Sequence, residues 1–308
     1  MSNLNISLNK AVYGTSTNLG TGTKGAKAFF KKLKKGYLVE ADYVFDGSVD
    51  WTDEYANSLV AEGKIIVLED VSVVEAEDVA NAYEDIGDGV TSLDTEGLFG
   101  LKLKFRKGMY FNNVLNSLSG VGRFDFMGSD ADGKLIGTFA DNGTSLKGYK
   151  LGTHQVELPE GQFDSNSTLQ VFKLQLLDSS EVYNYAIKYP DDSFNANNIS
   201  PINEISLELT TPSGSDTSVT VKASYKQGGE VLPSVAFGQW NVKINGATQN
   251  PTGGDDSAES GTYILTGLPS ISATDVVSIS LYDNANSRSG ISVGGYLFKS
   301  STVSKTAV

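Results

Sequence analysis

The sequence contains no cysteine and a single histidine, His154. Without cysteine, the chain can form neither a disulfide framework nor a thiolate metal site, and it has no thiol nucleophile. One histidine is too few for a multi-histidine metal site, and no string typical of a serine hydrolase, a P-loop or a zinc protease accompanies it. We therefore expect a protein that is not an enzyme, with no catalytic residues, no metal and no cofactor.

Long apolar runs are also missing. The longest purely aliphatic run is Ile65 to Leu68, far shorter than a membrane span. Residues 1–13 lack the basic region and apolar core of a secretory signal. These absences predict a soluble protein made in a cytoplasm, with no membrane partner.

The composition favours a globular protein rich in β-strands. Apolar residues make up 39% and charged residues 20%, and the 33 glycines indicate many turns. At 308 residues, the chain is long enough for two domains, each with its own core.

Charge is distributed unevenly along the chain. Residues 1–39 contain seven lysines and no acid, whereas residues 40–96 contain seventeen acids and one base, Lys64. The net charge of −13 conceals these two opposite blocks. Such blocks can pair within one subunit or between neighbouring subunits, and complementary charge mainly fixes orientation and partner choice.

Residues 24–37 have the period of an amphipathic helix, and Gly36 would end it as a C-cap. Apolar side chains fall on one side of this helix and lysines on the other. The lysines are the candidate subunit-interface residues: Lys24, Lys27, Lys31, Lys34 and Lys35. A solvated helix face is the plain alternative. Nucleic acid is a disfavoured partner because the whole chain is acidic, with a pI near 4.5.

Two other sequence motifs lack the neighbouring residues that their function requires. Gly20, Gly22 and Gly25 match the dinucleotide-binding string, but no buried apolar strand precedes them and no series of β-α-β units follows. Residues 128–133 lack the first acid of a calcium loop, and Phe139 stands where a bidentate glutamate is needed. Other acidic clusters are interpreted as surface charge.

The first 190 residues predict one α+β domain, in which a β-meander follows a few short helices. Its turns are expected at Asp132-Gly133 and Asn142-Gly143. The expected helices after residue 37 are 52–62, 75–86 and 109–118. The expected strands are 4–8, 65–74, 101–105, 123–127, 135–140, 146–151, 168–177 and 182–189.

Residues 191–203 have the polar composition of a linker, and residues 204–308 predict an all-β, Ig-like sandwich. Five segments there alternate apolar and polar residues between glycine-, asparagine- and serine-rich turns. Trp240 lies within one of them. We expect it in the core, with a carbohydrate-binding platform as the alternative.

This layout resembles that of virion structural proteins of tailed bacteriophages. The features that carry the resemblance are the α+β body, the turns at 132–134 and 142–143, the segment Lys147-Gly148-Tyr149 and the C-terminal Ig-like domain. The resemblance is one of architecture, and no diagnostic motif supports it. It implies a tail-tube, connector or head-associated subunit, assembled in the host cytoplasm and located in the virion.

The resemblance implies that the partners are copies of the chain and other virion proteins, with the Ig-like domain projecting outward. Self-assembly would use complementary charged faces, which agrees with the opposite charge blocks. The rival hypothesis is a surface adhesin whose sandwich binds glycans, and a weak glycan contact by a virion protein is a related alternative.

Overall fold

The computed structural model describes residues 33–46, 49–79, 82–85, 91–95, 97–141, 145–158, 169–254, 256, 259–285 and 287–308. They form two compact units. The first ends at Ile199 and the second runs from Ser200 to Val308, with residues 57–62 grouped with the second. Strands dominate both units, as the composition predicts.

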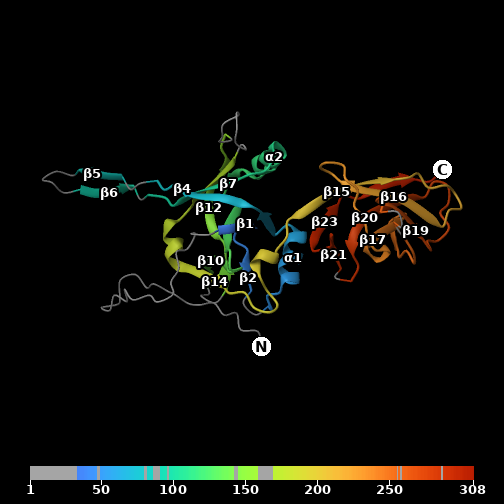
Figure 1. Cartoon of the computed structure of the whole chain (residues 1–308), viewed down its shortest axis with the longest axis horizontal. Helices are drawn as coiled ribbons and strands as arrows, with labels where there is room; N and C mark the ends of the chain where they lie inside the picture. Colours follow the sequence, from blue (N-terminus) through green and yellow to red (C-terminus); the bar gives the residue numbers. More distant parts are fainter. Residues whose placement is uncertain are drawn as a thin grey trace. The chain divides into compact units, whose positions relative to one another are not determined.

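The first unit is built on one extended antiparallel sheet (Figure 1). Its strands are β1 (Leu33–Glu40), β2 (Val44–Phe45), β3 (Ile65–Leu68), β4 (Val71–Ala76), β7 (Gly100–Phe105), β8 (Gly120–Val121), β9 (Phe124–Asp130), β10 (Leu135–Phe139), β11 (Leu146–Lys147), β12 (Tyr149–Val156), β13 (Gln170–Leu176) and β14 (Tyr185–Lys188). The main path runs β2-β11-β10-β9-β12-β13-β7-β4, and β1 pairs with both β3 and β9.

Strand β12 connects the two halves of this sheet. Its first residues pair with β9, and the rest pair with β13. Side chains from both halves then meet in one core, to which β1, β7, β9, β12 and β13 all contribute. Alternation explains this arrangement, because Leu101, Leu103 and Phe105 point inward while the lysines between them point to the other face.

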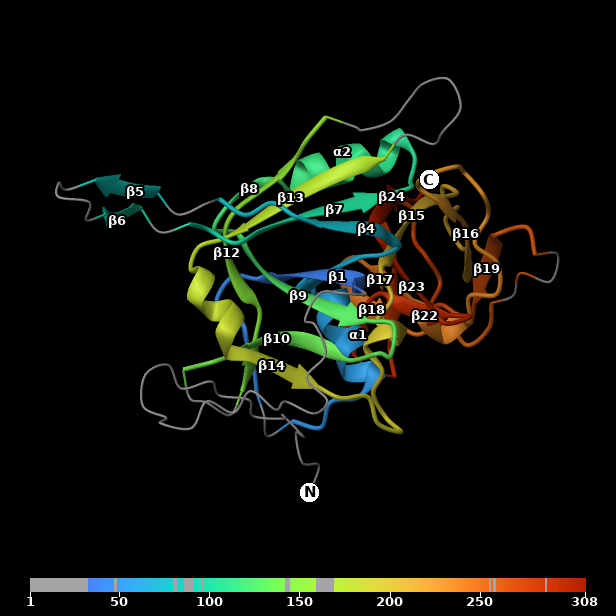
Figure 2. The same cartoon turned by 60° about the vertical axis from the view of Figure 1, so that its left-hand side comes forward.

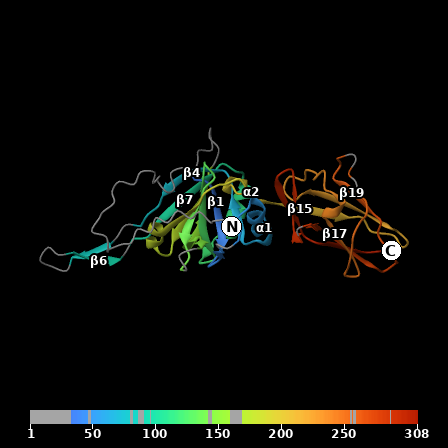
Figure 3. The ribbon, with the colours of Figure 1, turned by 90° about the horizontal axis from the view of Figure 1, so that it is seen from below.

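A long hairpin extends from the edge of the sheet. Strands β4 and β7 pair first, and the hydrogen bonds Glu77 N to Gly100 O and Val79 N to Leu98 O continue the ladder. Strands β5 (Ala82–Asp85) and β6 (Thr91–Thr95) then pair with each other and with no other described strand. Figure 1, Figure 2 and Figure 3 all show this pair beyond the ends of β4 and β7. We call residues 77–100 the arm.

Two α-helices lie where the sequence predicts them. Helix α1 (Asp53–Glu62) begins with two acids and is capped by Thr52, whose hydroxyl accepts a hydrogen bond from the Tyr55 amide. Helix α2 (Met109–Leu118) lies against β12 and β13, and its Leu115 is fully buried (Figure 2).

One predicted helix is wrong, and another is wrong in its last turn. The lysine-rich helix expected at 24–37 cannot include its last turn, because residues 33–40 form strand β1, and residues 24–32 lie outside the described part of the chain. Gly36 is no C-cap. A Cβ there would lie 3.1 Å from the Phe126 ring on the neighbouring strand β9, so glycine leaves room for that ring. The helix expected at 75–86 is replaced by the end of β4 and by β5.

Other predicted elements shift rather than disappear. The strand expected at 65–74 is two strands separated at Asp70, whose φ is 59°. The strand expected at 182–189 is a 3-10 helix, η1 (Ser179–Asn184), followed by β14. The turn at Asp132-Gly133 is confirmed, with Gly133 at φ 83°. The strand expected at 4–8 and the turn at Asn142-Gly143 fall on residues outside the described ranges.

The expected linker contains residues that pack into the first unit. Phe194, Ala196 and Ile199 are all buried, and Ala196 begins the 3-10 helix η2 (Ala196–Asn198). Polar residues here serve as turn-formers, since the Asp191 carboxylate accepts hydrogen bonds from the amides of Ser193 and Phe194. These residues therefore belong to the first unit, and the second begins directly after them.

The second unit consists of two sheets around one core. One sheet has the order β19-β16-β15-β23-β22 and the other β18-β17-β20, with β21 and β24 also on β20. Its elements are β15 (Ile202–Leu209), β16 (Ser218–Tyr225), η3 (Phe237–Gln239), β17 (Trp240–Ile244), β18 (Ala247–Gln249), β19 (Thr262–Thr266), β20 (Val276–Asp283), β21 (Arg288–Ser289), β22 (Ile291–Val293), β23 (Tyr296–Ser300) and β24 (Val303–Thr306).

The last two strands of the second unit belong to different sheets. β23 pairs in parallel with β15, and after a short break β24 pairs antiparallel with β20 in the other sheet. The inward-facing residues of both sheets, among them Val221, Leu265, Val242 and Ile279, form a single core. The alternation seen in the sequence is thus the buried and exposed alternation of these strands.

Candidate functional site

The predicted interface lysines divide into three groups. Lys24, Lys27 and Lys31 lie outside the described residues. Lys34 lies on β1 and is exposed. Lys35, the next residue along the same strand, is buried. The structure therefore separates two lysines that helical spacing places on one solvent-facing side.

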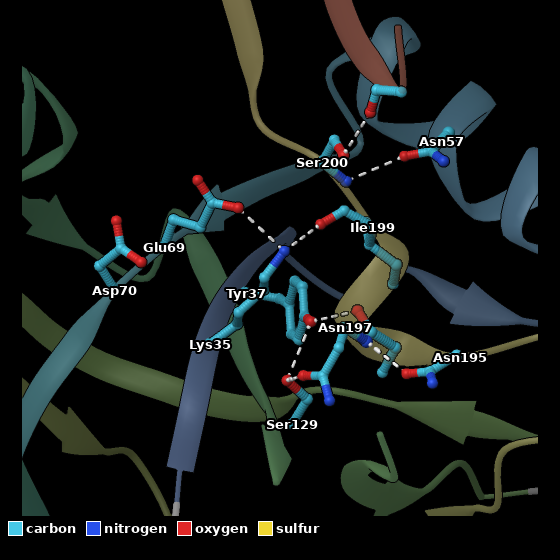
Figure 4. A network of polar contacts seen from close by, with 12 residues as sticks. Lys35, Tyr37, Asn57, Glu69, Asp70, Ser129, Asn195, Asn197, Ile199 and Ser200 are labelled. Atoms are coloured by element: carbon cyan, nitrogen blue, oxygen red, sulfur yellow. Dashed lines mark hydrogen bonds and ion pairs between the residues drawn. The ribbon is translucent and has the colours of Figure 1, made fainter. Parts of the chain in front are cut away.

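Lys35 is held inside the first unit by two partners (Figure 4). Its ammonium lies 3.0 Å from Glu69 Oε1 and donates a 2.9 Å hydrogen bond to the Ile199 carbonyl. A buried ammonium is tolerated only when it is paired and hydrogen-bonded, and both conditions hold here. Lys35 is thus unavailable to a neighbouring subunit, and the interface prediction does not extend to it.

Tyr37, two residues further along β1, anchors the same segment. Its hydroxyl donates a 2.7 Å hydrogen bond to the Ala196 carbonyl and lies 3.1 Å from Ser129 Oγ, which lies 3.2 Å from Asn197 Oδ1. Burial raises the pKa of Tyr37 above its ordinary range. The side chains of β1 and β9 therefore fasten residues 196–199 to the sheet, as Figure 4 shows.

Several acids of the 40–96 block are paired within the first unit. Asp42 pairs with Lys150 at 2.8 Å and Asp70 with Lys107 at 3.2 Å. Glu40 pairs with Lys64. This part of the acidic block therefore finds its complement inside its own chain.

Cross-strand pairs at the base of the arm continue this pattern. Glu75 lies 2.7 Å from the Lys104 ammonium, and Glu77 lies 3.2 Å from that of Lys102 and 3.1 Å from that of Lys173. Such pairs link β4, β7 and β13 on the face opposite the core. The alternation of lysine with leucine at 101–104 signals this face, but its partners are not readable from local sequence.

One buried carboxyl group in the first unit titrates near neutral pH. Asp125 on β9 is 1% exposed; its Oδ2 accepts a 3.0 Å hydrogen bond from the Asp42 amide, and its Oδ1 has no partner. Burial raises the pKa of Asp125 to about 6, and the carboxylates of Asp42 and Glu181 add to the shift. The hydrogen bond from the Asp42 amide opposes it, and Lys147 opposes it more weakly. The sequence gives no signal of this group, because several aspartates stand in similar strands.

His154 and Trp240 both lie in cores. His154 is fully buried, with its ring 5.4 Å from that of Phe124, and burial lowers its pKa. Trp240 is fully buried, with its ring centroid 5.0 Å from that of Tyr263. The core interpretation of Trp240 is confirmed, and this residue cannot serve as a platform for sugars.

The described residues contain no group of three or more His, Asp or Glu side chains placed to hold a metal ion. No helix in this part of the chain has the length and apolar character needed to cross a bilayer. The arm is the most distinctive surface feature that remains, because β5 and β6 pair only with each other in the described structure. Comparisons with family models, with curated proteins and with solved structures found no match for this chain.

Proposed function

We propose that this protein is a non-enzymatic structural subunit that assembles with copies of itself, of the kind found in virions of tailed bacteriophages. The arm is the observation that carries this proposal. A subunit of a tail tube, connector or head decoration must hold its neighbours through repeated contacts, and a projecting hairpin can reach them. Assembly would take place in the host cytoplasm and end in the virion.

The arm has features that are unfavourable in a monomeric protein. An isolated two-stranded hairpin is marginally stable in water, and unpaired strand edges invite further pairing. The β5–β6 pair has both properties in the described structure, because it is joined to no third strand. Coverage by a neighbouring subunit would stabilise it.

The second unit supports the same proposal as an Ig-like sandwich. Its first sheet contains the first, second and fifth strands (β15, β16, β19), and its second contains the third and the sixth (β17, β20), as in immunoglobulin domains. Trp240 stands at the start of the third strand, where such domains carry a buried tryptophan. We propose that this domain projects from the assembly.

A shortened arm tests the function. Val79 and Leu98 face each other through the Val79 N to Leu98 O hydrogen bond, so an Asn-Gly turn can replace residues 80–97 and close the hairpin there. We expect the wild-type chain at high concentration to form rings or tubes in negative-stain images and to sediment as large species. The shortened chain should remain monomeric.

The unfolding midpoint of the shortened chain is the control, since it should stay close to the wild-type value if the body folds normally. Wild-type protein that stays monomeric at every concentration would contradict the proposal. So would a shortened chain that assembles as well as the wild type.

A further inference from the structure

His154 lies on strand β12 in a site that suits only its neutral form. The residue is fully buried, and neither ring nitrogen is hydrogen-bonded to a described residue. A Cβ at Gly120, on the paired strand β8, would lie 3.5 Å from Nε2, so the backbone of β8 passes close to this nitrogen. Protonation would add a second unpaired N–H and a charge to this enclosed site, and both are costly to bury.

The charge nearest to the ring in sequence and space has the same sign as a protonated histidine. Arg123 lies over the Phe124 ring at 5.1 Å, and that ring in turn lies 5.4 Å from the ring of His154. Burial lowers the pKa of His154, Arg123 lowers it further, and the backbone of Leu118 opposes the shift in part. The neutral ring therefore prevails at pH 7.

No carboxylate faces the ring from the described elements packed around it. Helix α2 and strand β8 contain no charged side chain. The charged residues of the flanking strands alternate with core residues and so point to the opposite face of the sheet: Asp125, Lys150, Glu157 and Lys173. An imidazolium at this position would thus meet Arg123 without a compensating acid.

The segment that joins α2 to the sheet is attached around this ring. The Val156 amide donates a 3.1 Å hydrogen bond to Ser119 Oγ, and the Gly122 amide donates a 3.2 Å hydrogen bond to the Gly152 carbonyl. Between these two bonds, β8 pairs with β12. A charge on His154 would therefore act where the α2–β8 segment, residues 109–122, is held to β12.

We propose that His154 is an acid-sensitive latch whose protonation releases the α2–β8 segment from β12. Release would uncover the apolar side of α2, where Leu115 is fully buried and the Phe111 ring lies 5.1 Å from that of Phe105. An exposed histidine has a pKa near 6.5, so protons favour the released state as the pH falls below this value. This inference goes beyond the proposed function and does not depend on self-assembly.

Amide hydrogen exchange of the full-length chain at low concentration tests the latch. After correction for the intrinsic exchange rate, the open fraction reported by the Gly122 and Val156 amides should rise about tenfold between pH 6.5 and pH 5.0. The Leu232 amide, in the second unit, should change by less than about twofold. The Glu40 amide on β1 should stay better protected than Gly122 throughout, because the release is local. Equal protection of Glu40 and Gly122 would mean global unfolding and would overturn the latch.

Two variants identify the group that responds. His154→Phe keeps a buried ring that cannot be charged, so its open fraction should not follow the pH. Because the chain has one histidine, its ring gives one histidine signal in NMR spectra. The titration midpoint of this signal should lie below 6.5 in the wild type and move upward in Arg123→Gln.

Two outcomes would refute the latch. One is a rise in the open fraction of His154→Phe as large as that of the wild type. The other is a wild-type histidine midpoint at or above 6.5, a result that needs no variant to fold. Neither measurement involves association between chains, so either failure would leave the proposed function standing.

Discussion

At the scale of single residues, buried lysines with fixed partners characterise the first unit. Lys35, Lys104 and Lys188 are all at most 7% exposed, and each pairs with a carboxylate. Burial of an unpaired charge is costly, so each pair fixes the position of the strand or turn that supplies the acid. These residues are structural, although as lysines in the sequence they look like surface charge.

Replacement of Lys35 should show this structural role. Lys35→Met keeps the stem of the side chain but leaves Glu69 and the Ile199 carbonyl without their common donor. We expect the free energy of unfolding of the first unit to fall by about 2 kcal/mol, less than for a fully buried pair because Glu69 is partly exposed. Urea unfolding measures it. Lys34→Met, at the exposed neighbouring position, should change stability by less than about 0.5 kcal/mol, and equal effects of the two would refute this assignment.

Asp125 should make the stability of the first unit depend on pH. Its pKa is about 6 in the folded protein, above the ordinary aspartate value, so the folded state binds the proton more tightly. The stabilisation of the folded state by this tighter proton binding is therefore fully present below pH 4 and is lost as the pH rises through 6. Asp125→Asn cannot ionise, so its free energy of unfolding should exceed that of the wild type by about 1 to 2 kcal/mol at pH 7.5. The difference should be smaller at pH 4. Chemical unfolding at both pH values measures the gap, and a gap independent of pH would contradict the assignment.

At the scale of elements, local signals sufficed for helices but not for the lysine-rich strand. α1 and α2 match their predicted ranges because a first-turn acid pair or a periodic apolar face is encoded within ten residues. The sequence leading into β1 has the period of a helix. The strand nevertheless pairs with β3 and β9 on its two edges and buries Tyr37, Leu38 and Val39. Two-sided pairing outweighs local period, because it satisfies the backbone and buries both faces.

The arm depends on a close approach of two backbones at its base. A Cβ at Gly100 would lie 2.4 Å from the Glu77 carbonyl oxygen and 3.3 Å from that of Leu174. Gly100→Ala should therefore force the strands apart and destabilise the first unit by about 2 kcal/mol. The matched control is Gly152→Ala, whose Cβ would meet its nearest atom at an ordinary 3.4 Å. Thermal unfolding compares them, and equal midpoints would show that the arm base tolerates a side chain.

At the scale of the whole molecule, each unit contains one of the two tryptophans. Trp51 is buried in the first unit, with its ring centroid 5.0 Å from that of Phe45 and 5.5 Å from that of Phe194. Trp240 lies in the second core. Because each unit has its own core, we expect each to unfold as its own cooperative transition.

Fluorescence can follow each unit separately. In a Trp240→Phe background, the remaining emission reports the first unit, and adding Lys35→Met should lower its unfolding midpoint. In a Trp51→Phe background, emission reports the second unit, and Lys35→Met should leave its midpoint unchanged. Equal shifts in both backgrounds would show that the units unfold together, contrary to this expectation.

The sequence by itself determined the opposite charge blocks, the strand-rich composition, two helices and the alternating strands of residues 204–308. Each of these is a local or summed property, and alternation at 219–223 or 277–281 needs no knowledge of the partner strand. Only the tertiary structure decided that Lys35 is buried beside Glu69, that Glu77 meets Lys102 and Lys173, and that residues 194–199 pack instead of linking. These outcomes depend on which distant strands pair, and pairing is chosen by the burial and hydrogen bonding of the whole sheet.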